Sequence, residues 1–139
     1  GGALILEAGG TITVEGLVSA HGESANVQRS GGGSGGSVWL KAPRIAGRGT
    51  IAAAGGDGTY ESATTGGGGG AGGRILLMFG AVRGFAAGWA GAVESAVPPA
   101  NLLFTGAVAA PGGAGFTAGA DGTIRFLYMQ PPGACIRFR

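Results

Sequence analysis

The side chains able to carry acid–base or metal chemistry are few and lie far apart in this sequence. Its two aspartates, Asp57 and Asp121, are separated by almost half of the chain, and the five glutamates are also scattered. Cleavage of a glycosidic bond needs two carboxyl groups flanking it, and calcium needs several oxygen ligands that converge on one point. Asp57 and Glu61 can share a loop, but two loop carboxylates are usually just solvated. We therefore predict no catalytic residues.

Histidine and cysteine chemistry is equally restricted. His21 is the single histidine and Cys135 the single cysteine, so the chain can form neither a histidine-based metal site or triad nor an internal disulfide. His21 also occupies a repeat position that holds Ala54 and Pro111 in other copies. A position that accepts all three residue types favours an exposed corner over a metal ligand.

Two glycine-containing stretches resemble ligand-binding loops without completing them. Gly55–Gly58 matches part of the calcium repeat of β-rolls, but no tandem run follows to share the ions. Gly66–Gly73 lacks the Gly-Lys-Ser/Thr ending of a phosphate-binding loop. We therefore predict no metal and no cofactor, and a protein that is not an enzyme. A polysaccharide lyase is the least favoured alternative.

Glycine dominates the composition, with 34 of the 139 residues, whereas an ordinary domain has about 7%. Without a strict Gly-x-y period this excludes collagen. Hydrophobic residues make up 45% of the chain and fall in short runs bounded by glycine, which favours strands over disorder. The nine cations form no cluster, which argues against nucleic acid as a partner. The longest uncharged stretch, 95–120, contains prolines, so no membrane span is expected.

Two motifs recur along the chain. The first, a glycine pair or its equivalent followed by a strand, begins at intervals of 34, 37 and 49 residues. Its four copies are Gly1–Ala8, Gly35–Ala42, Gly72–Phe79 and Asp121–Tyr128. The second motif, G-x-[VI]-[SA]-A-x-G, lies between them at Gly16–Gly22, Gly49–Gly55 and Gly106–Gly112, with a degenerate copy at Gly88–Gly91. Such internal repetition is typical of solenoid proteins.

The repeats predict an all-β fold, a right-handed parallel β-helix (solenoid) with Gly-rich corners and about four two-motif repeats. The glycine runs at 30–36 and 66–73 are interpreted as tight corners rather than linkers. Residues 1–139 form a single segment, expected to be a fragment of a longer chain because both ends fall inside repeat units. The stretch 82–101 breaks the repeat and is interpreted as a possible lid or insertion.

Alignment of the first motif predicts which strand positions face inward. Strand alternation puts Leu4, Val38, Ile75 and Ile124 in one inward column and Leu6, Leu40, Leu77 and Phe126 in the next. The outward positions then hold an apolar stripe of Ile5, Trp39, Leu76 and Met78, with Glu7 and Lys41 placed to form an ion pair. A contiguous apolar stripe usually marks an interaction site, but the segment Val82–Asn101 can equally cover it.

The glycine-rich repeats also resemble a known family. The stretch GGGSGGSVWL at 31–40, the GxGTIAAxGGxG pattern from Gly47 and the GGGGGxGGRI pattern from Gly66 are similar to repeats of very large glycine-rich surface proteins. Those proteins occur in plants, algae and protists, with similar repeats in bacterial exported proteins, and are thought to form pectin-lyase-like β-helices. The resemblance implies an architecture rather than an activity, since β-helices host lyases, adhesins and passive stalks.

Two functions are therefore expected, in order. The first is a structural component of an extracellular or cell-surface fibre, stalk, sheath or flagellar hair, which assembles with copies of itself or related chains by rung stacking and an apolar face. The second is an adhesin-like module that binds carbohydrate, surface polysaccharide or another surface. In the second, exposed Trp39, Tyr60 and Trp89 would stack on sugar rings.

Overall fold

The computed structural model describes residues 1–62, 65–80 and 92–130, and its regular structure there is entirely β. Sheet A holds, in spatial order, β1 (Ala3–Glu7), β4 (Ser37–Lys41), β9 (Arg74–Gly80), β13 (Thr123–Met129) and β10 (Ala92–Ser95). Sheet B holds β11 (Leu103–Phe104), β5 (Arg44–Gly47) and β2 (Thr11–Thr13). Sheet C holds β12 (Ala107–Ala109), β6 (Thr50–Ala52) and β3 (Leu17–Ser19). A short antiparallel pair joins β7 (Tyr60–Ser62) and β8 (Thr65–Gly66).

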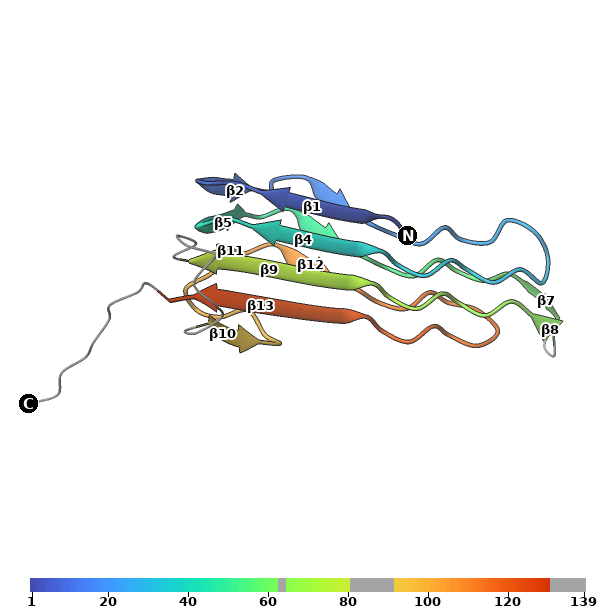
Figure 1. Ribbon diagram of the computed structural model, residues 1–139. Coiled ribbons are helices and arrows are strands. Elements are labelled where there is room, and N and C mark those ends of the chain that lie inside the picture. Colours follow the sequence, from blue (N-terminus) through green and yellow to red (C-terminus); the bar gives the residue numbers. More distant parts are fainter. Residues whose placement is uncertain (63–64, 81–91, 131–139) are drawn as a thin grey trace, which may run out of the picture.

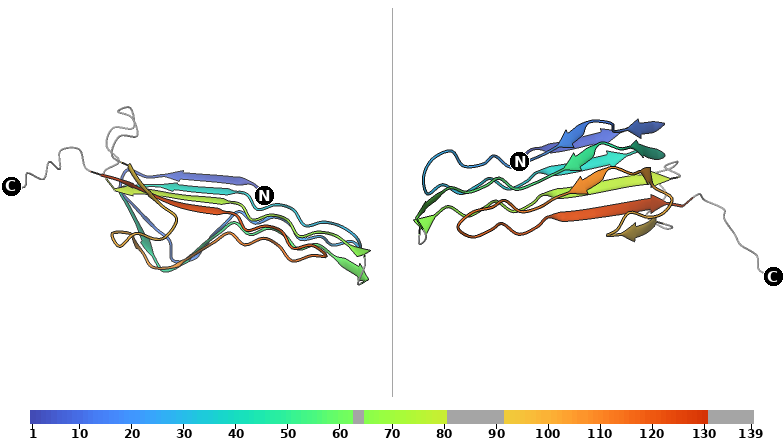
Figure 2. Two further views of the ribbon diagram at one scale, coloured as in Figure 1. Left: turned by 90° about the horizontal axis from the view of Figure 1, so that it is seen from below. Right: turned by 180° about the vertical axis from the view of Figure 1, so that it is seen from behind.

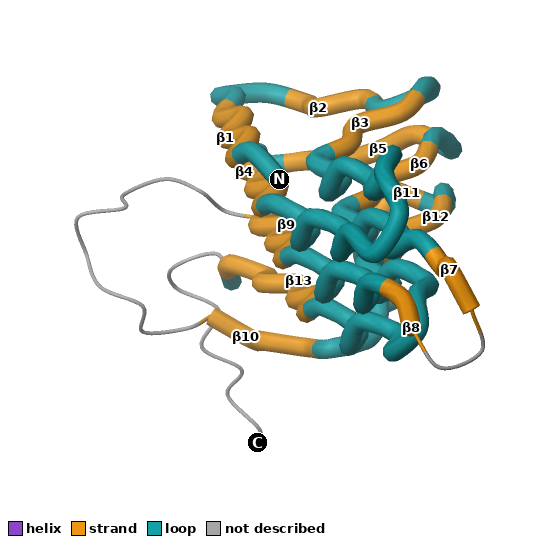
Figure 3. Tube along the Cα trace, turned by 90° about the vertical axis from the view of Figure 1, so that its right-hand side faces the viewer, coloured by secondary structure: helices purple, strands orange, loops and turns teal. Residues whose placement is uncertain are grey.

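The chain is arranged in layers, each of which gives one strand to sheet A, then one to sheet B and one to sheet C. The first layer (1–36) holds β1, β2 and β3, and the second (37–73) holds β4, β5 and β6. The third (74–122) holds β9, β11 and β12, and also contributes β10. Figure 3 shows the three columns of strands that result, with β13 next to β9 and β10 beyond it.

The predicted alignment of the first motif is confirmed. Its four copies are β1, β4, β9 and β13, which pair in parallel so that Leu4 lies opposite Val38, Val38 opposite Ile75, and Ile75 opposite Ile124. Three copies of the second motif supply β3, β6 and β12, which are also parallel and in register. The degenerate copy at 88–91 lies outside the described residues.

The predicted right-handed parallel β-helix with four two-motif repeats is wrong. The parallel strands form separate small sheets that do not close into a tube, and sheet A is mixed because β10 pairs antiparallel with β13. The glycine runs are also not corners. They belong to long extended segments that return the chain to sheet A, as the undulating traces of Figures 1 and 2 show.

These extended segments pack together in what we call the glycine bundle. Three outgoing segments (20–27, 53–59 and 110–116) lead away from sheet C, and three returning segments (31–36, 67–73 and 117–122) lead back to sheet A. Backbone hydrogen bonds join neighbouring segments. Because glycine has no side chain to pack, these bonds and the dense contact of the backbones hold the bundle together.

The bonds of the bundle recur at every third residue. In the returning segment 67–73 the amides of Gly70 and Gly73 donate to the outgoing segment 53–59, with N···O distances of 2.8 and 2.7 Å. The amides of Gly69 and Gly72 donate instead to the next returning segment, at 2.8 Å. A period of three without bonds inside a segment is typical of the polyproline II conformation, in which all backbone groups are free to bond to neighbours.

The hydrophobic core lies between sheets A, B and C. Sheet A contributes Val38, Leu40, Ile75, Leu77 and Phe126, which are at most 2% exposed, and sheets B and C contribute Ile45 and Ile51. These residues fill the inward columns that strand alternation predicts. Gly47 has a positive φ of 113°, and a Cβ there would lie 2.1 Å from the carbonyl oxygen of Val14, so only glycine allows sheet B to approach the first layer this closely.

A pair of glycine substitutions tests the bundle. A Cβ at Gly70 would lie 2.0 Å from the carbonyl oxygen of Gly33, whereas a Cβ at exposed Gly68 would meet nothing nearer than the Thr117 oxygen at 3.5 Å. We expect Gly70→Ala to lower the free energy of unfolding by roughly 1–3 kcal/mol, the usual cost of overpacking. Gly68→Ala should change it by less than about 0.5 kcal/mol. Urea unfolding followed by circular dichroism measures both, and equal effects would contradict a close-packed bundle.

Candidate interaction surfaces

The two aspartates considered as catalytic candidates bond to the backbone of the glycine bundle. Asp57 Oδ1 accepts a hydrogen bond from the amide of Ala114 at 2.7 Å, and Asp121 Oδ1 accepts one from the amide of Gly112 at 3.0 Å. Both residues are exposed, and among the described residues no group of three or more acidic, histidine or cysteine side chains is close enough to hold a metal ion. The side chain of Glu61 lies outside the described residues.

His21 and Ser24 of the first layer have the same role toward the second layer. Nδ1 of His21 accepts from the amide of Ala54 at 3.1 Å, and the Ser24 hydroxyl oxygen accepts from the amide of Asp57 at 2.9 Å. In each case a polar side chain of one layer satisfies a backbone amide of the next, which leaves that donor paired. The sequence pattern did not predict this structural role.

The predicted outward stripe of sheet A exists as a column but is only partly accessible. Register places Ile5, Trp39 and Leu76 side by side, and Ile5 is 65% exposed while Trp39 and Leu76 are half-buried. Met78 is only 1% exposed and presents no surface. Nε1 of Trp39 is buried and has no hydrogen-bond partner among the described residues.

The neighbouring column contains a charge that is unusually well buried. Lys41 is 8% exposed, and its ammonium group forms the predicted ion pair with the carboxylate of Glu7 in the adjacent layer. Lys41, Met78 and Leu127 lie opposite one another in β4, β9 and β13, and all three are buried. The alkyl stem of Lys41 therefore packs among apolar neighbours while its ammonium group reaches Glu7 at the edge of the sheet.

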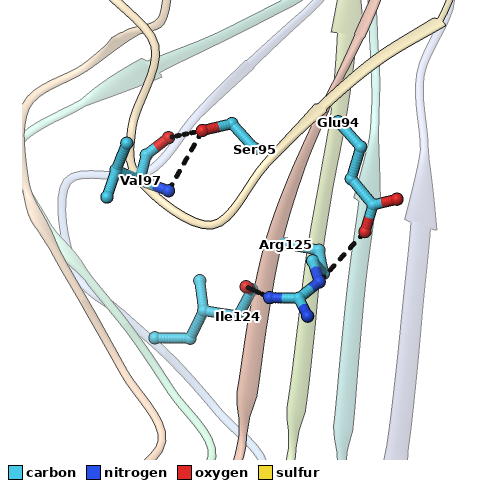
Figure 4. A network of polar contacts seen from close by, with 5 residues as sticks. All are labelled: Glu94, Ser95, Val97, Ile124 and Arg125. Atoms are coloured by element: carbon cyan, nitrogen blue, oxygen red, sulfur yellow. Dashed lines mark hydrogen bonds and ion pairs between the residues drawn. The ribbon is translucent and has the colours of Figure 1, made fainter.

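A groove runs along the outer face of sheet A beside β10. Its volume is ≈ 530 Å³, and it is lined by Arg74, Ile75, Leu76, Glu94, Thr123, Arg125 and Leu127. Nε of Arg125 lies 3.0 Å from Oε1 of Glu94, so an ion pair within the groove lining joins β13 to its neighbour β10, as Figure 4 shows. Sequence reasoning missed this groove because β10 comes from the stretch that breaks the repeat.

A second exposed cluster lies at the far end of the glycine bundle, near the β7–β8 pair. Val27, Tyr60 and Phe116 come from successive layers and are 61%, 61% and 47% exposed. The hydroxyl group of Tyr60 donates to the carbonyl oxygen of Gly115, which holds the ring in place. Tyr60 was predicted as an interaction residue. Trp89, predicted with it, lies outside the described residues. Of the possible lid, 82–101, the structure describes only the part from residue 92 onward, and there β10 extends sheet A at the edge of β13.

No protein-family model matches this chain, and neither the curated proteins nor the solved structures contain a match to it. In the portion of the chain that the structure describes, no helix is long and apolar enough to cross a membrane.

The structural role of Asp57 can be tested directly. Asp57→Ala removes the acceptor for the Ala114 amide, and we expect the free energy of unfolding to fall by roughly 1 kcal/mol, the value of one hydrogen bond. Asp57→Asn keeps a side-chain oxygen and should retain most of that stability. Chemical denaturation of the two variants beside the parent protein measures the difference. An Asp57→Ala variant as stable as the parent would show that this bond contributes nothing.

Proposed function

We propose that this protein is a structural component of an extracellular or cell-surface fibre, stalk, sheath or flagellar hair, built by adding further layers to its exposed first layer. One observation carries the proposal. Leu4 and Leu6 are 39% and 44% exposed, although Val38 and Leu40, which occupy the same columns in the second layer, are 1% and 0% exposed. Core side chains are thus uncovered in the first layer.

The backbone of the first layer supports the same proposal. β1, β2 and β3 each pair with the second layer on one side, and among the described residues no strand pairs with their other side. A row of free amide and carbonyl groups beside exposed leucines is a template on which another strand can add. Because all three strands lie at the edges of their sheets on the same side of the stack, one added layer would satisfy all of them.

The opposite side of the stack also exposes apolar side chains. Val93, Val97, Leu103 and Phe116 of the third layer are 47–67% exposed. In the middle layer, by contrast, Tyr60 is the one large hydrophobic residue of this exposure among the described residues. Apolar surface is therefore concentrated where a neighbouring copy or a related chain would stack, and the low fraction of charged residues, 12%, favours such association.

The assembly can be tested with a charge placed on the first layer. Electron microscopy of the concentrated protein should show fibres, and fibre diffraction should give an axial spacing of about 4.7–4.9 Å, the distance between paired strands. Leu6→Lys should prevent fibre formation because it brings an ammonium group into the new interface, and light scattering should then report monomers. Ala71→Lys adds the same charge to the exposed side of the middle layer and should leave the fibres intact.

Two results would overturn this proposal. One is a parent protein that stays monomeric at every concentration tested. The other is a Leu6→Lys variant that is folded by circular dichroism and still polymerises as the parent does.

The far end of the glycine bundle favours a second function, that of an adhesin-like module for carbohydrate. Tyr60 exposes a ring whose hydroxyl group is already bonded to Gly115, so little side-chain freedom is lost when a sugar stacks on it. Screening on a glycan array should then detect ligands, with binding lost in Tyr60→Ala. Tyr60→Phe should keep the ring and weaken binding only slightly. A binding profile identical in Tyr60→Ala and the parent would exclude this surface.

A further inference from the structure

We propose that the groove on the outer face of β9, β13 and β10 binds an amphipathic anion, a small molecule with one carboxylate or sulfate group on an apolar body. The groove lies on the outer face of sheet A, so it is separate from the first-layer edge that the proposed assembly uses. Its volume of ≈ 530 Å³ falls within the range of about 300–1,000 Å³ that is usual for small-molecule sites.

The groove carries an excess of positive charge. Arg74 and Arg125 lie on the same outer face, because Arg74 pairs with Thr123 and Arg125 follows two residues later along β13. The two residues are thus diagonal neighbours across adjacent strands, within reach of one another for side chains of this length. Glu94 neutralises Arg125, while the exposed guanidinium group of Arg74 has no ionic or hydrogen-bond partner among the described residues. The two arginines and one glutamate therefore leave one positive charge in the groove without a matching anion.

The rest of the groove is apolar and supplies the site for the body of the ligand. Leu76 is half-buried and supplies the accessible apolar area of the groove, while Leu127 is 6% exposed and lies buried beside it. An apolar ligand would cover the part of Leu76 that is still in contact with water. The Thr123 hydroxyl group stands opposite Arg74 and adds a hydrogen-bond donor near the free guanidinium group. An anionic group at Arg74 and Thr123, with the apolar body over Leu76, satisfies both halves of the groove.

Glu94 provides a second test of anion binding in the groove. Its carboxylate holds Arg125 and therefore competes with any bound anion for that guanidinium group. Replacing it by glutamine would leave Arg125 without an ionic partner, although its guanidinium group would still donate to the carbonyl oxygen of Ile124. The substitution would also remove a repelling charge, so the groove would carry two cations without a matching anion. A groove that binds anions should consequently bind them more tightly after Glu94→Gln, whereas a merely structural ion pair gives no such gain.

Isothermal titration calorimetry with three probes tests the inference. Octanoate carries both features of the ligand, 1-octanol keeps the apolar body without the charge, and acetate keeps the charge without the body. We expect octanoate to bind at least tenfold more tightly than either of the others. Arg74→Gln should weaken octanoate binding at least fivefold, and Glu94→Gln should strengthen it severalfold. Arg48→Gln removes an arginine between β5 and β6, outside the groove lining, and should change nothing.

Any of three results overturns the inference. Equal affinity for octanoate and 1-octanol would identify a plain apolar patch. Equal weakening by Arg74→Gln and Arg48→Gln would identify a general charge effect. A Glu94→Gln variant with unchanged octanoate affinity, and a circular dichroism spectrum like that of the parent, would show that anions do not use Arg125.

Discussion

The structure depends on backbone segments that approach one another more closely than any side chain allows. In the glycine bundle amides at intervals of three residues donate to a neighbouring segment, and a Cβ at a buried position such as Gly70 or Gly113 would lie 1.9–2.0 Å from a carbonyl oxygen. This contact also sets the register of the sheets. Each returning segment leads straight into a strand of sheet A, so fixing the segments against one another places Ser37, Arg74 and Thr123 side by side.

The strand columns could be predicted from the sequence, because alternation of apolar and polar residues decides which side chains face a core. Val38, Ile75, Leu40 and Leu77 are buried as expected. The path of the chain between the strands could not be predicted in the same way. The repeats show that equivalent strands pair, but they carry no information on how the intervening glycines run. In a run such as 66–70, glycine stands at every position, so the sequence has no pattern that would separate buried from exposed residues.

A signal for the bundle is nevertheless present in the less uniform stretches. At 32–37 and 69–74 the sequence reads as Gly-Gly-x triplets, and the third positions, Ser34 and Ala71, are exposed while Gly36, Gly70 and Gly73 are buried. A period of three therefore separates the two sides of a segment, as a period of two does in a strand. The groove left no comparable signal. It depends on β10, whose antiparallel pairing with β13 follows from no repeat.

The division of each layer into a hydrophobic half and a glycine half has a thermal consequence. Unfolding the sheets exposes apolar surface, which raises the heat capacity, whereas unfolding the bundle exposes chiefly peptide groups, which lowers it. The two contributions oppose one another, so the stability of the whole chain varies less with temperature than its share of buried leucine, isoleucine and valine alone implies. Cooling weakens hydrophobic burial but leaves backbone hydrogen bonds largely intact. The glycine half would then hold the layers together in the cold.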